Sequence, residues 1–195
     1  MFNSFRLFFF GGMIGIANVI PGVSGGTLAV IFNIYDELIE SISHFFSDSQ
    51  NRKRYFIFLF QIGSGALVAV FLFSHLISYL IDYYRSYTFA YFLGLILASF
   101  PIVYRAHNNM SFTWKKLSFF ILSFGFVTGL LIFSSVNTSV STHSGYLYLF
   151  LSGIVAAAAM VIPGLSGSFI LLLMGSYEPI LKAVSDQNLP VIAVV

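Results

Sequence analysis

A proline- and glycine-rich break occurs twice in this chain, each time inside a stretch of apolar residues. The first is Pro21-Gly22-Val23-Ser24-Gly25-Gly26-Thr27 and the second is Pro163-Gly164-Leu165-Ser166-Gly167-Ser168. Proline removes a backbone donor and disfavours helix at the preceding residue, so the helix before each break should end there. In a membrane, the backbone groups freed by a break need partners inside the protein. Two breaks in matching contexts therefore indicate a binding site.

The composition is that of an integral membrane protein. Of the 195 residues, 58% are hydrophobic and 8% are charged, whereas a soluble domain carries about 25% charged residues. The net charge of +2 is too small to indicate nucleic acid as a partner. The sequence has no cysteine, no His/Glu metal spacing, no P-loop and no catalytic triad, and we predict no cofactor. We expect an all-α, multi-pass membrane protein.

Each broken segment is predicted to form a re-entrant hairpin, which enters and leaves the membrane on one side. The helix over residues 7–20 would rise only about 21 Å, short of the roughly 30 Å hydrocarbon core. Gly22 suits the left-handed conformation at a helix end, and Ser24 is a good N-cap for a second helix over 24–42. Residues 146–184 are expected to form the other hairpin. Full spans are expected over 55–81, 88–104 and 117–133, with Gly63 and Gly65 favouring close helix packing.

A shift of 142 residues lays Pro21 on Pro163, and eleven of the 33 positions over 7–39 are then identical. The match includes Pro-Gly-x-Ser-Gly in register, followed by Asp36 or Glu178 15 positions after the proline. We interpret this as an internal repeat. One transmembrane domain, 1–195, would hold repeat 1 (about 7–134) and a partial repeat 2 (about 146–195). Since a complete repeat 2 would reach about residue 276, we expect a truncated chain or helices supplied from elsewhere.

The distribution of basic residues predicts the orientation. With two hairpins and three spans, seven of the nine Lys and Arg residues fall on one side, which we assign to the cytoplasm. Three spans separate the hairpins, so the hairpins would open from opposite sides. The repeats are therefore expected to be inverted.

The hairpin tips are the candidate binding site, because hydroxyls and helix-start amides can donate hydrogen bonds to phosphate or carboxylate oxygens. Opposed hairpins would bring the tips towards the midplane, as in alternating-access transporters. The alternative is that the glycines only allow packing and Ser24 only caps its helix. The candidate site residues are Asn18, Pro21, Gly22, Ser24, Gly25, Gly26, Thr27, Pro163, Gly164, Ser166, Gly167 and Ser168.

Five charged residues are further candidates. Asp36, Glu37 and Glu178 could couple movement to a proton or sodium ion or act in gating, or they could anchor helices at the interface. Arg85 and Arg105 could guide a phosphate head group, and interfacial snorkelling explains them equally well.

Longer signatures around the breaks resemble those of bacterial and archaeal polyprenyl-phosphate transporters, long described as a domain of unknown function. They are Asn-Val-Ile-Pro-Gly-Val-Ser-Gly-Gly-Thr over 18–27 with Ile-Tyr-Asp-Glu-Leu over 34–38, and residues 156–170 with 175–179; residues 94–101 also fit. The resemblance covers the whole chain, although family members are usually longer. It implies a flippase in the cytoplasmic membrane of a prokaryote. The flippase would return undecaprenyl phosphate from the outer to the cytoplasmic leaflet for cell-envelope synthesis. The implied partners are polyprenyl phosphate and membrane lipids. Whether the protein forms a homo-oligomer is left open by the sequence.

The main alternative is an enzyme. Undecaprenyl-diphosphate phosphatases also use inverted re-entrant hairpins, with the motif Pro-Gly-x-Ser-Arg-Ser. This chain has Gly25 and Gly167 where that motif has arginine, and it lacks an acidic cluster near the first tip. An arginine there would stabilise the charge on a transferring phosphoryl group, so its absence favours a transporter over an enzyme. A small-anion carrier or channel is the third interpretation.

Overall fold

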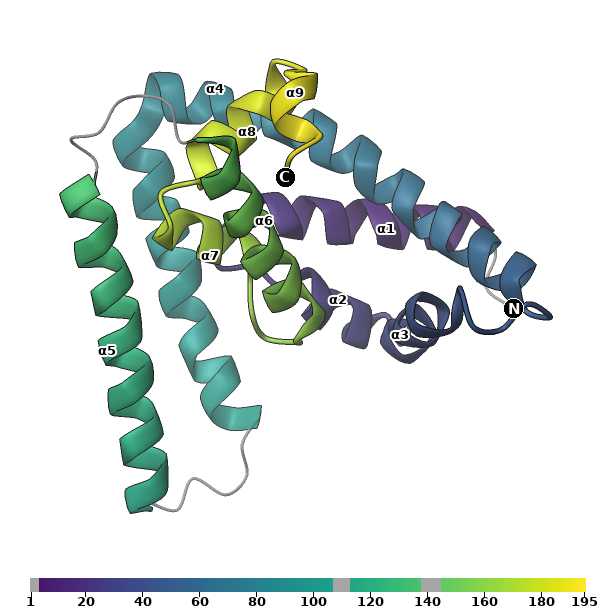
Figure 1. The fold of residues 1–195 in the computed structure, drawn as a ribbon, viewed down its shortest axis with the longest axis horizontal. Helices are drawn as coiled ribbons and strands as arrows, with labels where there is room; N and C mark the ends of the chain where they lie inside the picture. Colours follow the sequence, from purple (N-terminus) through teal and green to yellow (C-terminus); the bar gives the residue numbers. More distant parts are fainter. Residues whose placement is uncertain (1–3, 107–112, 138–144) are drawn as a thin grey trace.

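The computed structural model describes residues 4–106, 113–137 and 145–195, and all of the regular structure in these ranges is helical (Figure 1). The all-α prediction is confirmed for this part of the chain. The helices are α1 (Ser4–Val19), α2 (Gly25–Ile31), α3 (Tyr35–His44), α4 (Arg52–Ala106), α5 (Trp114–Asn137), α6 (Tyr146–Val161), α7 (Gly167–Leu173), α8 (Tyr177–Ser185) and α9 (Leu189–Ile192).

The proline break has the predicted geometry in both segments. Gly22 and Gly164 take left-handed φ angles of 90° and 93°, and a serine caps the helix that follows each of them. The cap bonds run from Thr27 N–H to Ser24 Oγ (3.2 Å) and from Phe169 N–H to Ser166 Oγ (3.4 Å). The predicted end of the first helix and the predicted N-cap at Ser24 are confirmed.

Each broken segment contains a second break, so the prediction of one helix over 24–42 is wrong. Asn33 and Gly175, again 142 positions apart, adopt φ angles of 55° and 69° and end α2 and α7. Asparagine and glycine tolerate this conformation best, and the amides beyond them turn back to the helix in a Schellman motif. The returning bonds are Ile34 N–H to Ala29 O (3.0 Å) and Ser176 N–H to Leu171 O (2.9 Å).

The longest helix, α4, has two arms that meet at a bend (Figure 1). Tyr84 is its non-helical residue, with φ −132° and ψ 39°. The arms contain the predicted spans 55–81 and 88–104, but the predicted loop over 82–87 is otherwise helical, because it contains neither glycine nor proline. The Thr88 hydroxyl bonds to Leu80 O (3.1 Å) and Tyr84 O (3.0 Å), which gives two carbonyls beside the bend a donor.

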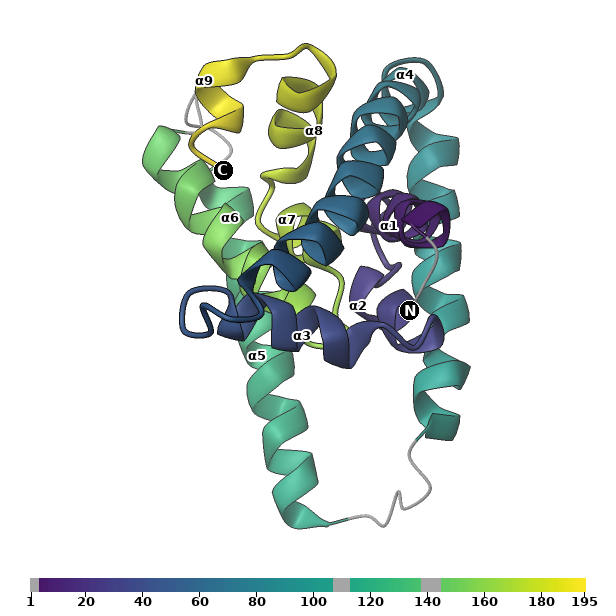
Figure 2. The ribbon, with the colours of Figure 1, turned by 90° about the vertical axis from the view of Figure 1, so that its right-hand side faces the viewer.

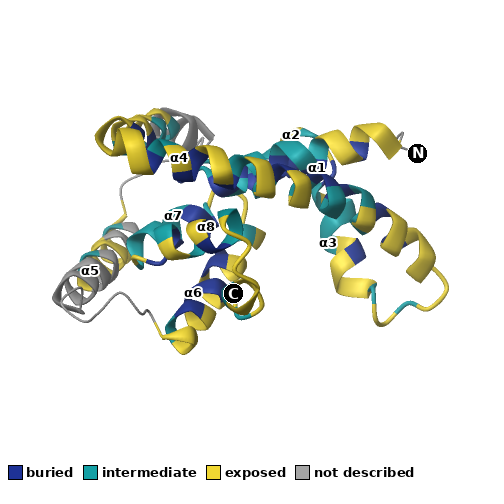
Figure 3. Ribbon diagram, turned by 90° about the horizontal axis from the view of Figure 1, so that it is seen from above, coloured by how far each residue is buried: buried dark blue, intermediate teal, exposed yellow. Residues whose placement is uncertain are grey.

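Helix α1 packs closely along the first arm of α4, and Figure 3 shows buried residues where the two meet. A Cβ atom at Gly65 would lie 2.0 Å from Phe8 O, and one at Gly11 would lie 2.1 Å from Ile62 O. Both positions therefore require glycine. The predicted packing role is confirmed for Gly65 but is wrong for Gly63, where a Cβ would have no atom within 4 Å.

The outward faces of the helices are largely apolar. Within Arg52–Ser99, only 22% of the most apolar window is buried, whereas a soluble core helix is buried over most of its surface. Among the described residues, this stretch is the one helix whose length and composition would allow it to cross a membrane. Helices α7 and α8, bent by 119°, could form one more span as a pair. The apolar helices α1 and α6 have 16 residues each, fewer than one span needs.

Candidate functional site

The two proline breaks lie against each other, and Figure 2 shows the segment α6–α8 beside α1 and α2. The Gly164 amide donates to the Thr27 hydroxyl at 2.9 Å. A Cβ atom at Gly26 would lie 3.1 Å from Met160 O and 3.5 Å from the Cα of Pro163. The structure thus brings residues 24–27 of the first tip together with residues 160–164 of the second. We call these two stretches, extended to Ser168 in the second, the paired tips.

Several hydrogen-bond donors remain at the paired tips. In the part of the chain that the structure describes, the amides of Gly25, Gly26 and Gly167 have no acceptor. The hydroxyls of Ser166 and Ser168 lie 3.1 Å apart and share one hydrogen bond. Helices α2 and α7 have only seven residues each, so an anion at the tips would be bound by these donors rather than by a helix macrodipole.

The two segments also share the packing behind each tip. A Cβ atom at Gly25 would lie 2.3 Å from Asn18 Oδ1, and one at Gly167 would lie 2.5 Å from the Cε of Met160. The 142-residue shift lays Asn18 on Met160, so the same two positions touch in both segments. The space in which any side chain at Gly25 or Gly167 would begin is already filled.

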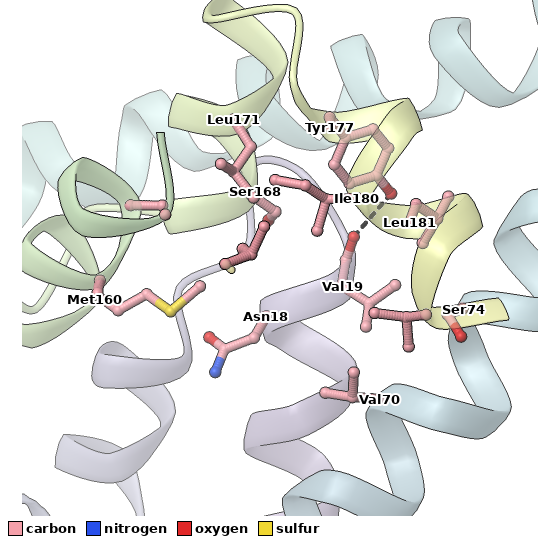
Figure 4. A pocket seen from close by; sticks show the side chains of 15 residues that line it. Asn18, Val19, Val70, Ser74, Met160, Ser168, Leu171, Tyr177, Ile180 and Leu181 are labelled. Carbon is pink, nitrogen blue, oxygen red and sulfur yellow. Dashed lines mark hydrogen bonds between the residues drawn. The ribbon is translucent and has the colours of Figure 1, made fainter. Parts of the chain in front are cut away.

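A mostly apolar cavity of about 330 Å³ lies beside the paired tips, between α1, α4, α6, α7 and α8 (Figure 4). Asn18 and Ser168 line it from the two tips, and Ser74 lines it from α4. Ser168 is buried and Asn18 is half-buried. Ser24 and Thr27, by contrast, do not line this cavity. Some of the predicted site residues therefore lie where the two tips meet, and others lie in the wall of the cavity.

Two tyrosines outside the predicted site also join the segments. The Tyr35 hydroxyl donates to Val161 O at 2.9 Å, and the Tyr177 hydroxyl donates to Val19 O at 2.8 Å. The 142-residue shift relates Tyr35 to Tyr177 and Val19 to Val161, so the same contact is made in both directions. The sequence pointed to these tyrosines through their identity between the segments and their place in the signatures 34–38 and 175–179, but neither signal indicated the contact.

Three of the charged candidates, Glu37, Arg85 and Glu178, form ion pairs near the two ends of the first arm of α4. From Arg54 to Asp82 this arm rises about 42 Å at 1.5 Å per residue. Ion pairs between partly exposed side chains join its start to α3 and its far end to α8. The pairs are Arg54–Glu37 (3.1 Å), Arg85–Glu178 (2.5 Å, with a second bond of 3.1 Å) and Lys182–Asp82 (2.8 Å).

No contact between a charged candidate and the paired tips occurs among the described residues. Asp36 is exposed on the first turn of α3, without an ion pair among the described residues. Glu37 and Arg54 line a second cavity of about 640 Å³, which contains none of the candidate phosphate ligands. Arg105 belongs to α4, but its side chain lies outside the described residues.

Comparison with known proteins agrees with the resemblance. Residues 14–195 match a family described as undecaprenyl phosphate translocase-like. The chain is 34% identical over 194 residues to a polyprenyl-phosphate transporter of Vibrio cholerae, with 92% of this chain and 60% of the relative covered. It is 32% identical over 189 residues to a polyprenyl-phosphate transporter of Staphylococcus aureus, with 90% and 64% covered. The chain thus spans between 60% and 64% of the length of these relatives. No solved structure matches. This chain belongs to the undecaprenyl phosphate translocase-like family.

Proposed function

We propose that this chain acts in a membrane transporter for polyprenyl phosphate. The transporter would return undecaprenyl phosphate from the outer to the cytoplasmic leaflet, where the carrier lipid is reused in cell-envelope synthesis. The names of the two relatives support the substrate class. The observation that supports the mechanism most is the 2.9 Å bond between Gly164 and Thr27, because two tips in contact could donate to one phosphate group together.

The paired tips would bind the phosphate through neutral donors. The hydroxyls of Ser24, Thr27, Ser166 and Ser168 and the free glycine amides would surround its oxygens, while the prolines and Gly22 and Gly164 maintain the bends. Hydrogen bonds to a charged group are worth about 1.5–3 kcal/mol each, so a few would hold a phosphate and still release it. The isoprenyl units next to the phosphate would lie in the apolar cavity lined by Asn18 and Ser168, with the rest of the chain in the bilayer.

We further propose that α1–α3 and α6–α8 are inverted re-entrant units in a single multi-pass domain. The ion pairs attach α3 and α8 to opposite ends of an α4 arm of about 42 Å, close to the 40–45 Å of a bilayer with its head groups. This distance supports entry of the two units from opposite membrane surfaces. Head-group guidance by Arg85 would then require a lipid phosphate to displace Glu178 from its ion pair.

The packing at Gly25 and Gly167 favours binding over hydrolysis. Asn18 and Met160 occupy the space where a side chain at these positions would begin. An arginine placed as in the phosphatase motif would therefore require the Asn18 side chain to move at the first tip, and the Met160 side chain and the Ala156 carbonyl to move at the second. Without a cation to stabilise a transferring phosphoryl group, a bound phosphate would leave unchanged.

Reconstitution in liposomes tests the proposed function. We expect the full protein to move undecaprenyl phosphate between leaflets, measured by the amount accessible to a phosphate-specific reagent added outside. It should leave undecaprenol in place, because the tips bind the phosphate. Comparing rates under proton and sodium gradients would identify a coupling ion. Release of inorganic phosphate from undecaprenyl diphosphate would contradict the proposal in favour of an enzyme, and uptake of free phosphate or sulfate would favour a small-anion carrier.

A further inference from the structure

Each proline break leaves carbonyl groups at the end of the preceding helix without their helical partners, and one of them belongs to the residue two positions before the proline. In a continuous helix, Val19 O would accept from the amide of Val23, four residues on. Val23 N–H instead donates to Ile20 O at 3.2 Å. An unpaired carbonyl inside a membrane is costly, so a break of this kind persists only where the protein supplies another donor. The second break repeats the arrangement, with Leu165 N–H donating to Ile162 O at 3.1 Å and the carbonyl of Val161 set free.

In both cases the new donor is a tyrosine from the other segment. Tyr35 donates to Val161 O and Tyr177 donates to Val19 O. Each tyrosine is the first residue of the helix after the second break, α3 or α8. A contact in which position i of one unit meets position j of the other, and j meets i, is the mark of a two-fold relation between units. Here that relation holds between two segments of one chain.

We propose that Tyr35 and Tyr177 are positioning residues that hold the paired tips in register with each other. The role rests on the proposed function, since the tips are the phosphate site. Each hydroxyl fixes the end of the opposite broken helix directly before its proline, and Gly164 then reaches Thr27. Because both bonds cross between the segments, any movement of one segment relative to the other must break them. The two bonds therefore stabilise the arrangement of the tips seen in this structure against the alternatives.

The two bonds differ in their surroundings. Tyr177 and Val19 are 3% and 6% exposed, whereas Val161 lies at the surface and Tyr35 is half-buried. A hydrogen bond shielded from water is the stronger one, so Tyr177 should contribute more than Tyr35. The Tyr177 ring also packs edge-on against Phe92, at 6.2 Å between centroids. A Tyr177→Phe variant keeps this ring contact and loses only the hydroxyl.

Distances between spin labels test the positioning role directly. The chain contains no cysteine, so Val30→Cys and Leu151→Cys provide two unique attachment points, both on exposed residues outside the paired tips. The full protein in liposomes would be compared with its Tyr35→Phe, Tyr177→Phe and double variants. Tyr148→Phe is the matched control, because that hydroxyl donates to Met174 O within its own segment.

We expect one narrow distance distribution in the parent and in the control. Tyr35→Phe should broaden it, Tyr177→Phe should broaden it further, and the double variant should show the largest spread. Undecaprenyl phosphate transfer should fall about 30-fold in the double variant, because it loses two hydrogen bonds of about 1 kcal/mol each. A double variant with the parent's narrow distribution would overturn the positioning role, even if it melts at a lower temperature. If the labels respond as expected but the parent moves no lipid phosphate, the positioning role stands and the proposed function fails.

Discussion

Gly65→Ala is expected to destabilise the protein by at least about 3 kcal/mol, the upper end of the cost of overpacking a core. The new methyl group would lie 2.0 Å from Phe8 O and 3.0 Å from Gly12 N, both backbone atoms that cannot turn away. Helix α1 would have to move off α4, and Gly11 would lose its close approach to Ile62 O. Since α1 leads directly into the first tip, transport should be lost together with stability. Thermal unfolding in detergent, followed by circular dichroism, measures the effect.

Gly63→Ala is the matched control for this prediction. It lies two residues away on the same helix, but its Cβ would meet no atom within 4 Å. Alanine there should leave the melting temperature unchanged or raise it slightly, since it is favoured over glycine in a helix by up to about 1 kcal/mol. Equal destabilisation by the two variants would contradict the close contact of α1 with α4.

The Ser24→Ala/Ser166→Ala double variant is expected to reduce undecaprenyl phosphate transfer by at least about 100-fold. Two hydrogen bonds to a charged phosphate, at about 1.5–3 kcal/mol each, would be lost, and each 1.4 kcal/mol corresponds to a factor of ten. Both helix caps would also be lost, at about 1 kcal/mol each, so the melting temperature should fall modestly. The initial rate of transfer in liposomes, normalised to folded protein, measures the effect.

Ser64→Ala provides the control for loss of a serine hydroxyl from the bundle. The Ser64 hydroxyl donates to Gln61 O of its own helix at 3.1 Å, away from the paired tips. Its removal should leave transfer near the parent rate. If a folded double variant at Ser24 and Ser166 transfers lipid within about twofold of the parent rate, both serines act only as helix N-caps and do not bind phosphate.

Local rules were sufficient to predict the features set by a few neighbouring residues. Proline, glycine and serine determined where α1 ends, the left-handed turn at Gly22 and the cap at Ser24. The second break was missed because asparagine also occurs within helices, and Asn33 becomes a helix end only through its Schellman bonds. At residues 82–87 a loop was predicted where the structure has a bent helix, because polar residues there suit an exposed helix as well as a loop.

Contacts between distant parts of the chain were beyond the reach of the sequence. The bond from Gly164 to Thr27 joins residues 137 positions apart, and that from Tyr177 to Val19 joins residues 158 positions apart. The repeat predicted that the two tips are alike and lie towards the midplane, but not which of their atoms touch. Similarly, Glu37 and Glu178 were recognised as candidates, but their arginine partners follow from how α3 and α8 lie along α4. Such pairings depend on the packing of whole helices rather than on residue type.

Transfer of undecaprenyl phosphate by the Ser24→Asn/Ser166→Asn and Ser24→Asp/Ser166→Asp double variants is the most direct test that the paired tips bind phosphate. Asparagine and aspartate are nearly equal in shape and cap a helix equally well, so both variants should fold like the parent. Asparagine retains N–H donors, whereas the aspartate carboxylate only accepts hydrogen bonds and repels a phosphate. We predict that the Asn variant keeps a substantial part of the parent rate and that the Asp variant loses transfer. Equal transfer by two well-folded variants would contradict phosphate binding at the tips.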